Sequence, residues 1–447
     1  MSGTPALGTG AEVLLAPRLE QRILPGLERM RRALDALGHP EKAFTSVLVL
    51  GTNGKGSTAA LLAGMLQAHG VRSGLYTSPH LVAVEERIRT DGSMIAPARL
   101  AGLVAGLNRF PELSYFETLT CAAIVEFAER GVDVAVLEAG LGGRWDASNA
   151  VDPAVALLTN VGTDHQQWLG DTRVAIAAEK AAALRGHEAI VAEWDDEVEP
   201  AIRAAANTAT PLSLASEWAE VSGSRGTRFT NQPCSHSGTP ASSEPRVPSP
   251  EPRADSSSEV RFSIAGQEST AKLPLLGQHQ LANLQLALAG LAALAKHGLA
   301  PAPDPEAVRR GIEGTVWPGR LQWCSCRGHR LLVDGAHNRE AIAAVAEALD
   351  RVGLSGSLHL LFSCLDDKPL GAMADLLRPR VLAVTVAPLD SPRATPVEKL
   401  AAAFPGCGRA ANVGAALLAL PADAPTLVTG SLRLAGAVLA EIGSDHG

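Results

Sequence analysis

The chain of 447 residues is long enough for two or three domains, each with a hydrophobic core of its own. Its formal net charge of −8 argues against a general nucleic-acid binder or membrane-surface binder. The first residues lack the basic start and long apolar core of a signal peptide, and no apolar run is long enough to span a membrane. We therefore expect a cytoplasmic protein.

A glycine-rich loop is the most informative local signal. Residues 51–58 read GTNGKGST and stand between the apolar run 47–50 and a segment rich in alanine and leucine. Strand, glycine loop and helix together point backbone N–H groups and a helix N-terminus at a phosphate. Lys55 can reach terminal phosphates, and Ser57 or Thr58 can meet a magnesium ion. The spacing departs from the usual Walker A pattern, and a glycine-rich turn without a ligand is the alternative.

Strands and helices alternate through the first half of the chain. We expect strands at 47–50, 132–138 and 154–160 and helices near 58–69, 117–130 and 172–185. This rhythm predicts an α/β fold in which an open parallel sheet of the P-loop type has helices on both faces.

Two breaks divide the second half. Residues 219–258 are rich in Ser and Pro and poor in apolar residues, which predicts a flexible surface insertion without chemistry of its own. A short hairpin near 260–266 and a long helix at about 281–297 follow. We expect an N-terminal nucleotide-binding domain over 1–306, a linker over 307–317 and a smaller Rossmann-like α/β domain over 318–447. The strands expected in this last domain lie near 330–333, 358–364, 381–387 and 425–429.

Polar residues follow several of the predicted strands. In an open α/β sheet, ligands bind beyond the carboxyl ends of the strands. Glu138 ends one strand and could hold magnesium beside the phosphate loop, and His165 follows the next strand. Each could also be an ordinary strand-end acid or a core or surface histidine, but their neighbouring positions favour a joint role. Ser78 could ligate a metal or lie in a plain turn, and DGAHN at 334–338 predicts a ligand-facing turn in the C-terminal half.

Lys180 lies within a predicted helix that Asp171 or Thr172 would cap. A lysine at such a position usually lies on a solvated helix face, and the local pattern by itself favours that interpretation. However, the chain has only seven lysines among its 39 Lys and Arg residues. A lysine here is therefore a better candidate than usual for a position that needs an amine.

These motifs together resemble the folylpolyglutamate synthase/dihydrofolate synthase family, which are ATP-dependent amide ligases related to the Mur cell-wall ligases. The matching segments are GTNGKGST, TSPHL, LEAGLGGRWDASN, GTDH followed by LGDT and EKA, WPGR and DGAHN. The likeness covers nearly the whole chain outside 219–258. TSPHL and GLGGRWDASN are the segments that indicate the folate branch.

The resemblance implies three groups of site residues, with ATP and Mg²⁺ as cofactors. The nucleotide group is Thr52, Asn53, Gly54, Lys55, Gly56, Ser57, Asn283, Arg320, Asp334 and His337. The metal group is Ser78, Glu138, His165 and Lys180, of which His165 and Lys180, together with Lys55, are the expected catalytic residues. The group around the pterin of the substrate is Ser114, Tyr115, Phe116, Glu117, Trp145, Asp146 and Ala147.

The resemblance also implies that Lys180 is carbamylated. A neutral amine must capture CO₂, so the lysine pKa must fall from its reference value of about 10.4. Arginine cannot do this, and the resulting carbamate is an anion that can ligate a second magnesium ion.

The implied activity is ATP-dependent addition of L-glutamate to dihydropteroate and to reduced folates through an acyl phosphate. We expect a monomer that binds neither nucleic acid nor membranes. The alternatives are a monofunctional folylpolyglutamate synthase, a Mur-type peptide ligase and a non-catalytic nucleotide switch. Two departures stand out: Ala83 and Val84 replace an arginine and an aromatic residue, and EKAAA replaces the usual EKAGI.

Overall fold

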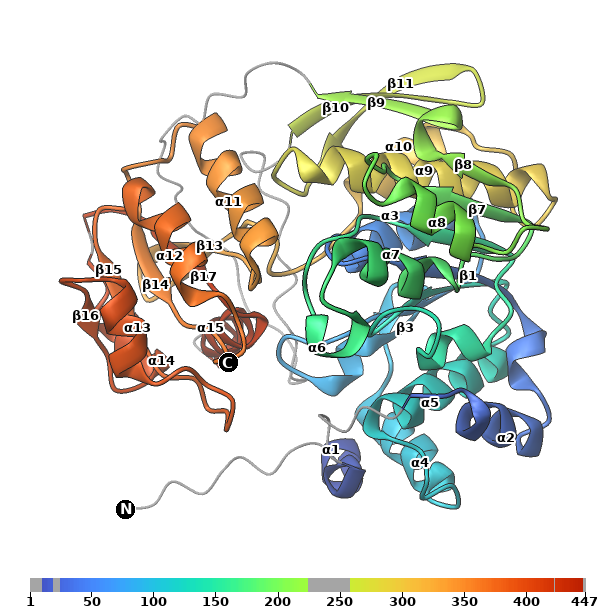
Figure 1. The fold of residues 1–447 in the computed structure, drawn as a ribbon, viewed down its shortest axis with the longest axis horizontal. Helices are drawn as coiled ribbons and strands as arrows, with labels where there is room; N and C mark the ends of the chain where they lie inside the picture. Colours follow the sequence, from blue (N-terminus) through green and yellow to red (C-terminus); the bar gives the residue numbers. More distant parts are fainter. Residues whose placement is uncertain (1–9, 19–24, 224–257, 422, 445–447) are drawn as a thin grey trace, which may run out of the picture. The chain divides into compact units, whose positions relative to one another are not determined.

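The computed structural model describes residues 10–18, 25–223, 258–421 and 423–444 (Figure 1). The chain divides into two compact units. The first holds most of the chain up to Thr315, and the second holds mainly residues 316–447. Within the described ranges, no helix is both long enough and apolar enough to cross a membrane.

The first unit is built on an eight-stranded sheet. Its strands are β1 (Thr45–Leu50), β2 (Ser73–Tyr76), β3 (Ile88–Thr90), β4 (Ser93–Met94), β5 (Val134–Glu138), β6 (Val155–Leu158), β7 (Glu188–Val191) and β8 (Leu212–Leu214). Their order across the sheet is β4-β3-β2-β5-β1-β6-β7-β8. All neighbours from β2 to β8 in this order are parallel, whereas β3 and β4 form an antiparallel edge. The predicted parallel sheet is confirmed, and the antiparallel edge is an addition.

Helices cover both faces of this sheet, because alternate strand residues point to opposite sides. One face packs in a core with Leu48 and Leu50, and its helices are α1 (Gly10–Leu15), α2 (Glu28–Ala36), α4 (Pro97–Leu107), α5 (Tyr115–Arg130), α7 (Arg173–Ala181) and α8 (Glu199–Ala205). The other face carries α3 (Lys55–Ala68), α9 (His279–Lys296) and α10 (Pro305–Glu313). On that face, Gly290 of α9 leaves room for Leu157 of β6 and Leu62 of α3.

A three-stranded sheet corrects the predicted bounds of the insertion. Strands β9 (Ala219–Gly223), β10 (Ser258–Ile264) and β11 (Gln267–Leu273) pair in the order β11-β10-β9. Both ends of the segment 219–258 are therefore strands, because a polar segment can still satisfy its backbone groups by pairing with a neighbour. Residues 224–257 of the predicted insertion lie outside the described residues.

Most of the segment expected as a linker, 307–317, is helical. It forms the larger part of α10, which packs so closely on α3 that a Cβ added at Gly311 would lie 2.5 Å from the Cα of Met65. The two units divide after Thr315, which places α10 in the first unit. The prolines that suggested a break mark the start of a helix instead, where proline is well tolerated.

The second unit is an α/β domain with a six-stranded sheet. Its strands are β12 (Gln322–Cys326), β13 (His329–Val333), β14 (His359–Phe362), β15 (Val384–Val386), β16 (Gly408–Arg409) and β17 (Thr426–Thr429). The order is β12-β13-β17-β14-β15-β16, and only β12 pairs antiparallel. The four predicted strands of this domain correspond to β13, β14, β15 and β17, whereas β12 and β16 were not predicted.

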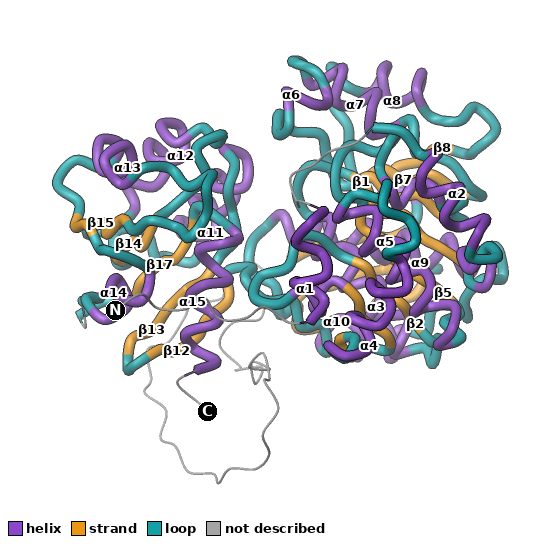
Figure 2. Tube along the Cα trace, turned by 90° about the horizontal axis from the view of Figure 1, so that it is seen from below, coloured by secondary structure: helices purple, strands orange, loops and turns teal. Residues whose placement is uncertain are grey.

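Among the described residues, the second unit also contains the helices of this α/β domain (Figure 2). They are α11 (Arg339–Arg351), α12 (Leu370–Leu377), α13 (Val397–Ala403), α14 (Val413–Leu418) and α15 (Leu432–Ser444). Leu332 and Leu360 pack in one core with α11, α12 and α13. The alternate residues Leu331 and Leu361 are also buried, so both faces of the sheet are covered.

Candidate active site

The glycine loop connects β1 to α3, as the sequence predicts, and two of its glycines are required by its shape. Gly51 has φ +141° and Gly54 has φ +84°, values that side chains rarely tolerate. A Cβ at Gly51 would collide with the hydroxyl of Thr159, and a Cβ at Gly54 would collide with the side-chain amide of Asn283. Asn283, expected to contact the nucleotide, therefore lies against the loop.

The end of β6 holds the loop backbone in place. The N–H of Thr52 donates to the carbonyl of Asn160 at 3.0 Å, and the N–H of Asn53 donates to the Asn160 side-chain oxygen at 3.0 Å. The Thr159 hydroxyl donates to the Asn53 carbonyl at 2.7 Å, and the N–H of Gly162 donates to the Thr52 hydroxyl at 2.9 Å. The Thr52 hydroxyl is thus bonded to the segment after β6, and together these bonds fix the shape of the loop.

Lys55 begins α3, and its amine donates to the Thr52 carbonyl at 3.1 Å. Gly56 and Ser57 follow in the buried first turn of α3. The hydroxyl of Thr58 is buried and has no hydrogen-bond partner among the described residues. A positive side chain and free helix N–H groups meet at this turn, which suits a phosphate group.

Lys180 lies in the last turn of α7, and the residue is only 3% exposed. Its amine donates to the carbonyl of Gly51 at 2.7 Å. Burial, followed by the nearby charge of Lys55, lowers the pKa of Lys180 to about 7, although Asp164 and Asp146 act in the opposite direction. The alternative of a solvated helix face is therefore excluded, and a large fraction of the amine is neutral near neutral pH.

The predicted metal residues are on the carboxyl side of the sheet. The N–H of Ser78 donates to Oε2 of Glu138 at 3.0 Å, which joins the ends of β2 and β5. His165 precedes the short helix α6 (Gln166–Leu169), and its Nε2 lies 3.8 Å from Oδ2 of Asp164. The charge of Asp164 also acts on Lys180, whose pKa it raises.

The predicted metal site would use donors other than carboxylates, imidazoles and thiols. Within the described part of the chain, no group of three His, Cys, Asp or Glu side chains is arranged to hold a metal ion. The predicted set contains two such side chains, Glu138 and His165, and adds the hydroxyl of Ser78 and a modified Lys180. Oxygen donors of this kind suit Mg²⁺, which keeps several waters and also binds substrate phosphates.

The two segments expected around the pterin meet each other. Ser114 caps α5, and Glu117 completes the cap by accepting from the Ser114 N–H at 2.7 Å. Phe116 contacts the loop after β5, since a Cβ at Gly140 would lie 2.6 Å from its ring, and this ring also lies 5.8 Å from that of Tyr76. The rings of Phe116 and Tyr76 therefore lie next to the loop after β5, which continues to Trp145, Asp146 and Ala147.

The polar members of these segments are largely occupied by internal bonds. Glu117 also accepts from Arg29 at 3.0 Å. The buried carboxylate of Asp146 accepts from the N–H groups of Leu141 and Ser148, at 2.8 and 3.0 Å, and burial raises its pKa. Trp145 is half-exposed, and Tyr115 lies under the guanidinium of Arg87 at 5.3 Å.

In the second unit, the three residues expected at the nucleotide surround the turn after β13. Asp334 accepts from the N–H groups of Leu321 and Ala336, at 2.8 and 2.7 Å. His337 Nδ1 lies 2.9 Å from the carbonyl of Gly335, and the Arg320 guanidinium lies against the same glycine. The DGAHN motif is thus a rigid turn at a strand's carboxyl end.

Two further residues near strand ends of the second unit were not singled out from the sequence. His279 begins α9, and burial lowers its pKa against the opposing charge of Asp334. Lys368 follows β14, and its side chain is only 7% exposed. The scarcity of lysine was the one signal that could have drawn attention to Lys368.

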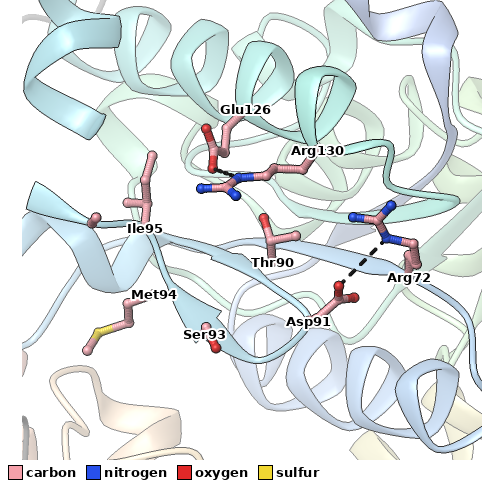
Figure 3. A pocket seen from close by; sticks show the side chains of 9 residues that line it. Arg72, Thr90, Asp91, Ser93, Met94, Ile95, Glu126 and Arg130 are labelled. Carbon is pink, nitrogen blue, oxygen red and sulfur yellow. Dashed lines mark hydrogen bonds and ion pairs between the residues drawn. The ribbon is translucent and has the colours of Figure 1, made fainter. Parts of the chain in front are cut away.

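A pocket of about 360 Å³ lies elsewhere in the first unit (Figure 3). Its two arginines pair with acids of the same pocket: Arg72 lies 3.9 Å from Asp91, and Arg130 donates to Glu126 at 2.9 Å. Arg72 directly precedes β2, whereas Ser78 follows that strand. The pocket therefore lies at the amino end of β2, whereas the glycine loop follows the carboxyl end of β1, which runs in the same direction.

The chain matches two protein families in succession. Residues 49–291 match the Mur ligase middle domain, and residues 319–431 match the Mur ligase glutamate ligase domain. The two matches together cover well over half of the chain.

Relatives in two organisms agree with this assignment. The chain is 32% identical over 393 residues to the dihydrofolate synthase/folylpolyglutamate synthase of Bacillus subtilis, covering 85% of this chain and 84% of the relative. It is 34% identical over 409 residues to a probable bifunctional folylpolyglutamate synthase/dihydropteroate synthase of Haloferax volcanii. That match covers 89% of this chain and 45% of the relative, so the chain spans less than half of that protein.

Solved structures share this fold. FolC of Escherichia coli in complex with DHPP and ADP superposes with a TM-score of 0.80 at 29% identity, covering 99% of this chain and 100% of that one. The bifunctional folylpolyglutamate synthase/dihydrofolate synthase of Yersinia pestis, complexed with AMPPNP and a Mn ion, gives 0.78 at 28% identity, with 98% and 99% covered.

Proposed function

Because the chain belongs to the dihydrofolate synthase/folylpolyglutamate synthase family of Mur ligases, we propose that it joins L-glutamate to both dihydropteroate and reduced folates, using ATP. The observation that carries this proposal is the buried amine of Lys180 at the phosphate loop, 2.7 Å from the Gly51 carbonyl. A nucleotide switch that only binds and releases partners has no need of such an amine. A ligase that transfers a highly charged phosphoryl group does need such an amine near the phosphates.

The proposed nucleotide contacts fall into two groups of residues. In the first unit, the loop residues from Thr52 to Ser57 would bind the phosphates, and Asn283 already lies against Gly54. The residues proposed from the second unit are Arg320, Asp334 and His337. The ADP and AMPPNP complexes of the E. coli and Y. pestis relatives support a nucleotide site in this fold.

The metal site of the proposal consists of Ser78, Glu138, His165 and a carbamylated Lys180. The Mn ion in the Y. pestis relative supports a divalent cation site in this fold. Bound there, magnesium would neutralise charge on the phosphates. The donor set fits this role, because Glu138 is buried and anionic oxygen ligands are the ones Mg²⁺ prefers.

The proposed reaction forms an acyl phosphate. The acceptor's carboxylate oxygen attacks the γ-phosphorus of ATP, and the bond from that phosphorus to the bridging oxygen of ADP breaks. The amino group of L-glutamate then attacks the acyl carbon, loses a proton and expels phosphate, which leaves an amide. Lys55 would hold the γ-phosphoryl group and offset its developing charge, an effect of position and electrostatics.

The pterin would lie beside Phe116 and the loop from Trp145 to Ala147. Support comes from the contact between Phe116 and Gly140, which brings both proposed segments together. The DHPP complex of the E. coli relative is consistent with an acceptor site in this fold. Action as a monomer in the cytoplasm remains a prediction of the sequence.

The decisive experiment measures ADP release with 7,8-dihydropteroate and, separately, with tetrahydrofolate, each with and without L-glutamate. Glutamate-dependent turnover with both acceptors supports a bifunctional ligase. Turnover with tetrahydrofolate alone makes the chain a monofunctional folylpolyglutamate synthase, in which the segments around Phe116 and Ala147 form no working pteroate site. Turnover with neither acceptor contradicts the proposal.

A further inference from the structure

The last turn of α7 is tied to the loop that follows β5. The main-chain N–H of Arg144 donates to the carbonyl of Glu179 at 3.0 Å, and Nε of Arg144 donates to Oε1 of the same residue at 2.9 Å. One residue earlier, a Cβ at Gly143 would lie 2.6 Å from the carbonyl oxygen of Lys180. The loop therefore contacts α7 at two successive residues, and the second of them is Lys180.

The bond from Arg144 completes the end of the helix. The last carbonyls of an α-helix have no partner within it and must find one elsewhere. The neighbouring carbonyls of α7 accept bonds from the turn that follows the helix. The carbonyl of Glu179 instead accepts from the loop, so Arg144 supplies the donor that this helix end needs.

A second tie holds the other side of the loop. The Asn149 side chain donates to the carbonyl of Arg144 at 3.0 Å. Arg185, in the turn after α7, donates to the carbonyls of Asn149 and Val151, at 2.8 and 3.0 Å. Arg144 is thus held on one side by the end of α7 and on the other by Asn149, which is itself bonded to Arg185 in the turn after α7.

The place of the Lys180 amine depends on this arrangement. A lysine side chain is long and flexible, so its amine stays at one point only if its backbone and its surroundings are fixed. We propose that Arg144 is a positioning residue that, through its pair with Glu179, holds the last turn of α7 so that the Lys180 amine stays beside Gly51. The inference rests on the proposed function, in which Lys180 acts beside the phosphate loop.

The pair itself contributes little to the stability of the fold. The side chains of Arg144 and Glu179 are 42% and 29% exposed, and ion pairs that water reaches contribute little to the free energy of unfolding. Loss of the pair should therefore change the reaction more than it changes the melting temperature. That difference separates a positioning role from a structural one.

The test compares Arg144→Gln, Glu179→Gln, the double variant and Arg144→Lys in the full chain. Arg144→Gln keeps the backbone bond and removes only the side-chain pair. We expect it to lower kcat about 10- to 100-fold, as is typical when a residue that orients a site is lost, with acceptor KM and melting temperature close to wild type. The double variant should be no slower than the slower single variant, and Arg144→Lys should recover part of the rate.

A readout independent of turnover is the carbamate on Lys180. Proteins incubated with ¹³C-bicarbonate and magnesium should show a carbamate carbon signal by NMR, weaker in Arg144→Gln than in wild type. The matched control is Arg351→Gln, which removes an exposed pair with Glu347 at 2.7 Å and should change neither rate nor signal.

Two results would overturn the inference. One is a wild-type kcat and carbamate signal in Arg144→Gln. The other is a double variant whose loss is the product of the two single losses, because independent residues multiply. An active Lys180→Ala enzyme would instead contradict the proposed role of Lys180 itself, so the two failures are distinguishable.

Discussion

The amine of Lys180 donates a hydrogen bond of 2.7 Å to the carbonyl of Gly51, across a sequence separation of 129 residues. This bond joins the last turn of α7 to the first residue of the glycine loop. Both partners are buried, so water does not compete for the bond, and burial disfavours the charged form of the amine. The fold thus holds a weakly basic amine beside the glycine loop of residues 51–58.

Replacing this lysine should separate activity from stability. Lys180→Met should abolish glutamate-dependent ADP release and raise the free energy of unfolding at neutral pH. The pKa of Lys180 falls from 10.5 to about 7 on folding, so between these values the unfolded chain binds more protons and wild-type stability rises with pH. Methionine removes the cost of burying the ammonium, on the order of a few kcal/mol.

Thermal unfolding from pH 6 to pH 10, without CO₂ or metal, measures this difference. The gap between Lys180→Met and wild type should be largest at the acidic end and shrink as pH approaches the unfolded value. Lys399→Met is the control, because Lys399 is exposed and pairs with Asp366 at 2.7 Å. A gap that does not change with pH would contradict the expected titration.

Gly54→Ala should weaken nucleotide binding for a reason beyond backbone strain. Gly54 has φ +84°, and its added Cβ would collide with Asn283. Gly38→Ala is a matched control, since Gly38 has φ +81° and nothing within 4 Å of its Cβ. Both variants carry the backbone cost of about 1–2 kcal/mol, but only Gly54→Ala should lose ADP affinity in calorimetric titration. Equal ADP affinities in the two variants would show that Gly54 has no specific role in nucleotide binding.

Gly311→Ala should destabilise the packing of α10 on α3. An added Cβ would lie 2.5 Å from the Cα of Met65 and 2.8 Å from the carbonyl of Gly64, where backbone cannot give way cheaply. We expect a loss of about 1–3 kcal/mol in chemical denaturation. Gly371→Ala, in α12 with open space around it, should instead be neutral or stabilising by up to about 1 kcal/mol. The expectation fails if Gly311→Ala behaves like Gly371→Ala.

Glu188→Gln should reduce stability because Glu188 is the buried carboxylate of a cluster with Lys296 and His297. Glu188 is 2% exposed at the start of β7, and its Oε1 lies 2.5 Å from the Lys296 amine and 3.1 Å from Nε2 of His297. Removing this carboxylate should cost about 1–3 kcal/mol of unfolding free energy. Glu347→Gln removes an exposed pair and should stay within about 0.5 kcal/mol of wild type. Equal effects would show that the cluster contributes no more than a surface pair.

Local patterns predicted the elements that carry the candidate site. The apolar run of β1 and the strand ending at Glu138 were recognisable because a buried parallel strand needs apolar side chains on both faces. Strands β9 and β12 were missed because their side chains are mixed and their definition comes from backbone bonds to distant partners. The helix α10 was missed because its prolines indicated a break, whereas proline also begins helices.

The sequence by itself determined the glycine loop after β1, the acid at the end of β5 and the family, because each of these depends on residues that are close together in the chain. Only the tertiary structure decided that Lys180 is buried, that Asn283 lies against Gly54 and that Arg144 completes the end of α7. Burial and contact depend on which distant segments pack together, and a local pattern carries no record of that packing. The local pattern around Lys180 favoured a solvated helix face. In the folded chain the lysine is instead buried, with its amine against the Gly51 carbonyl.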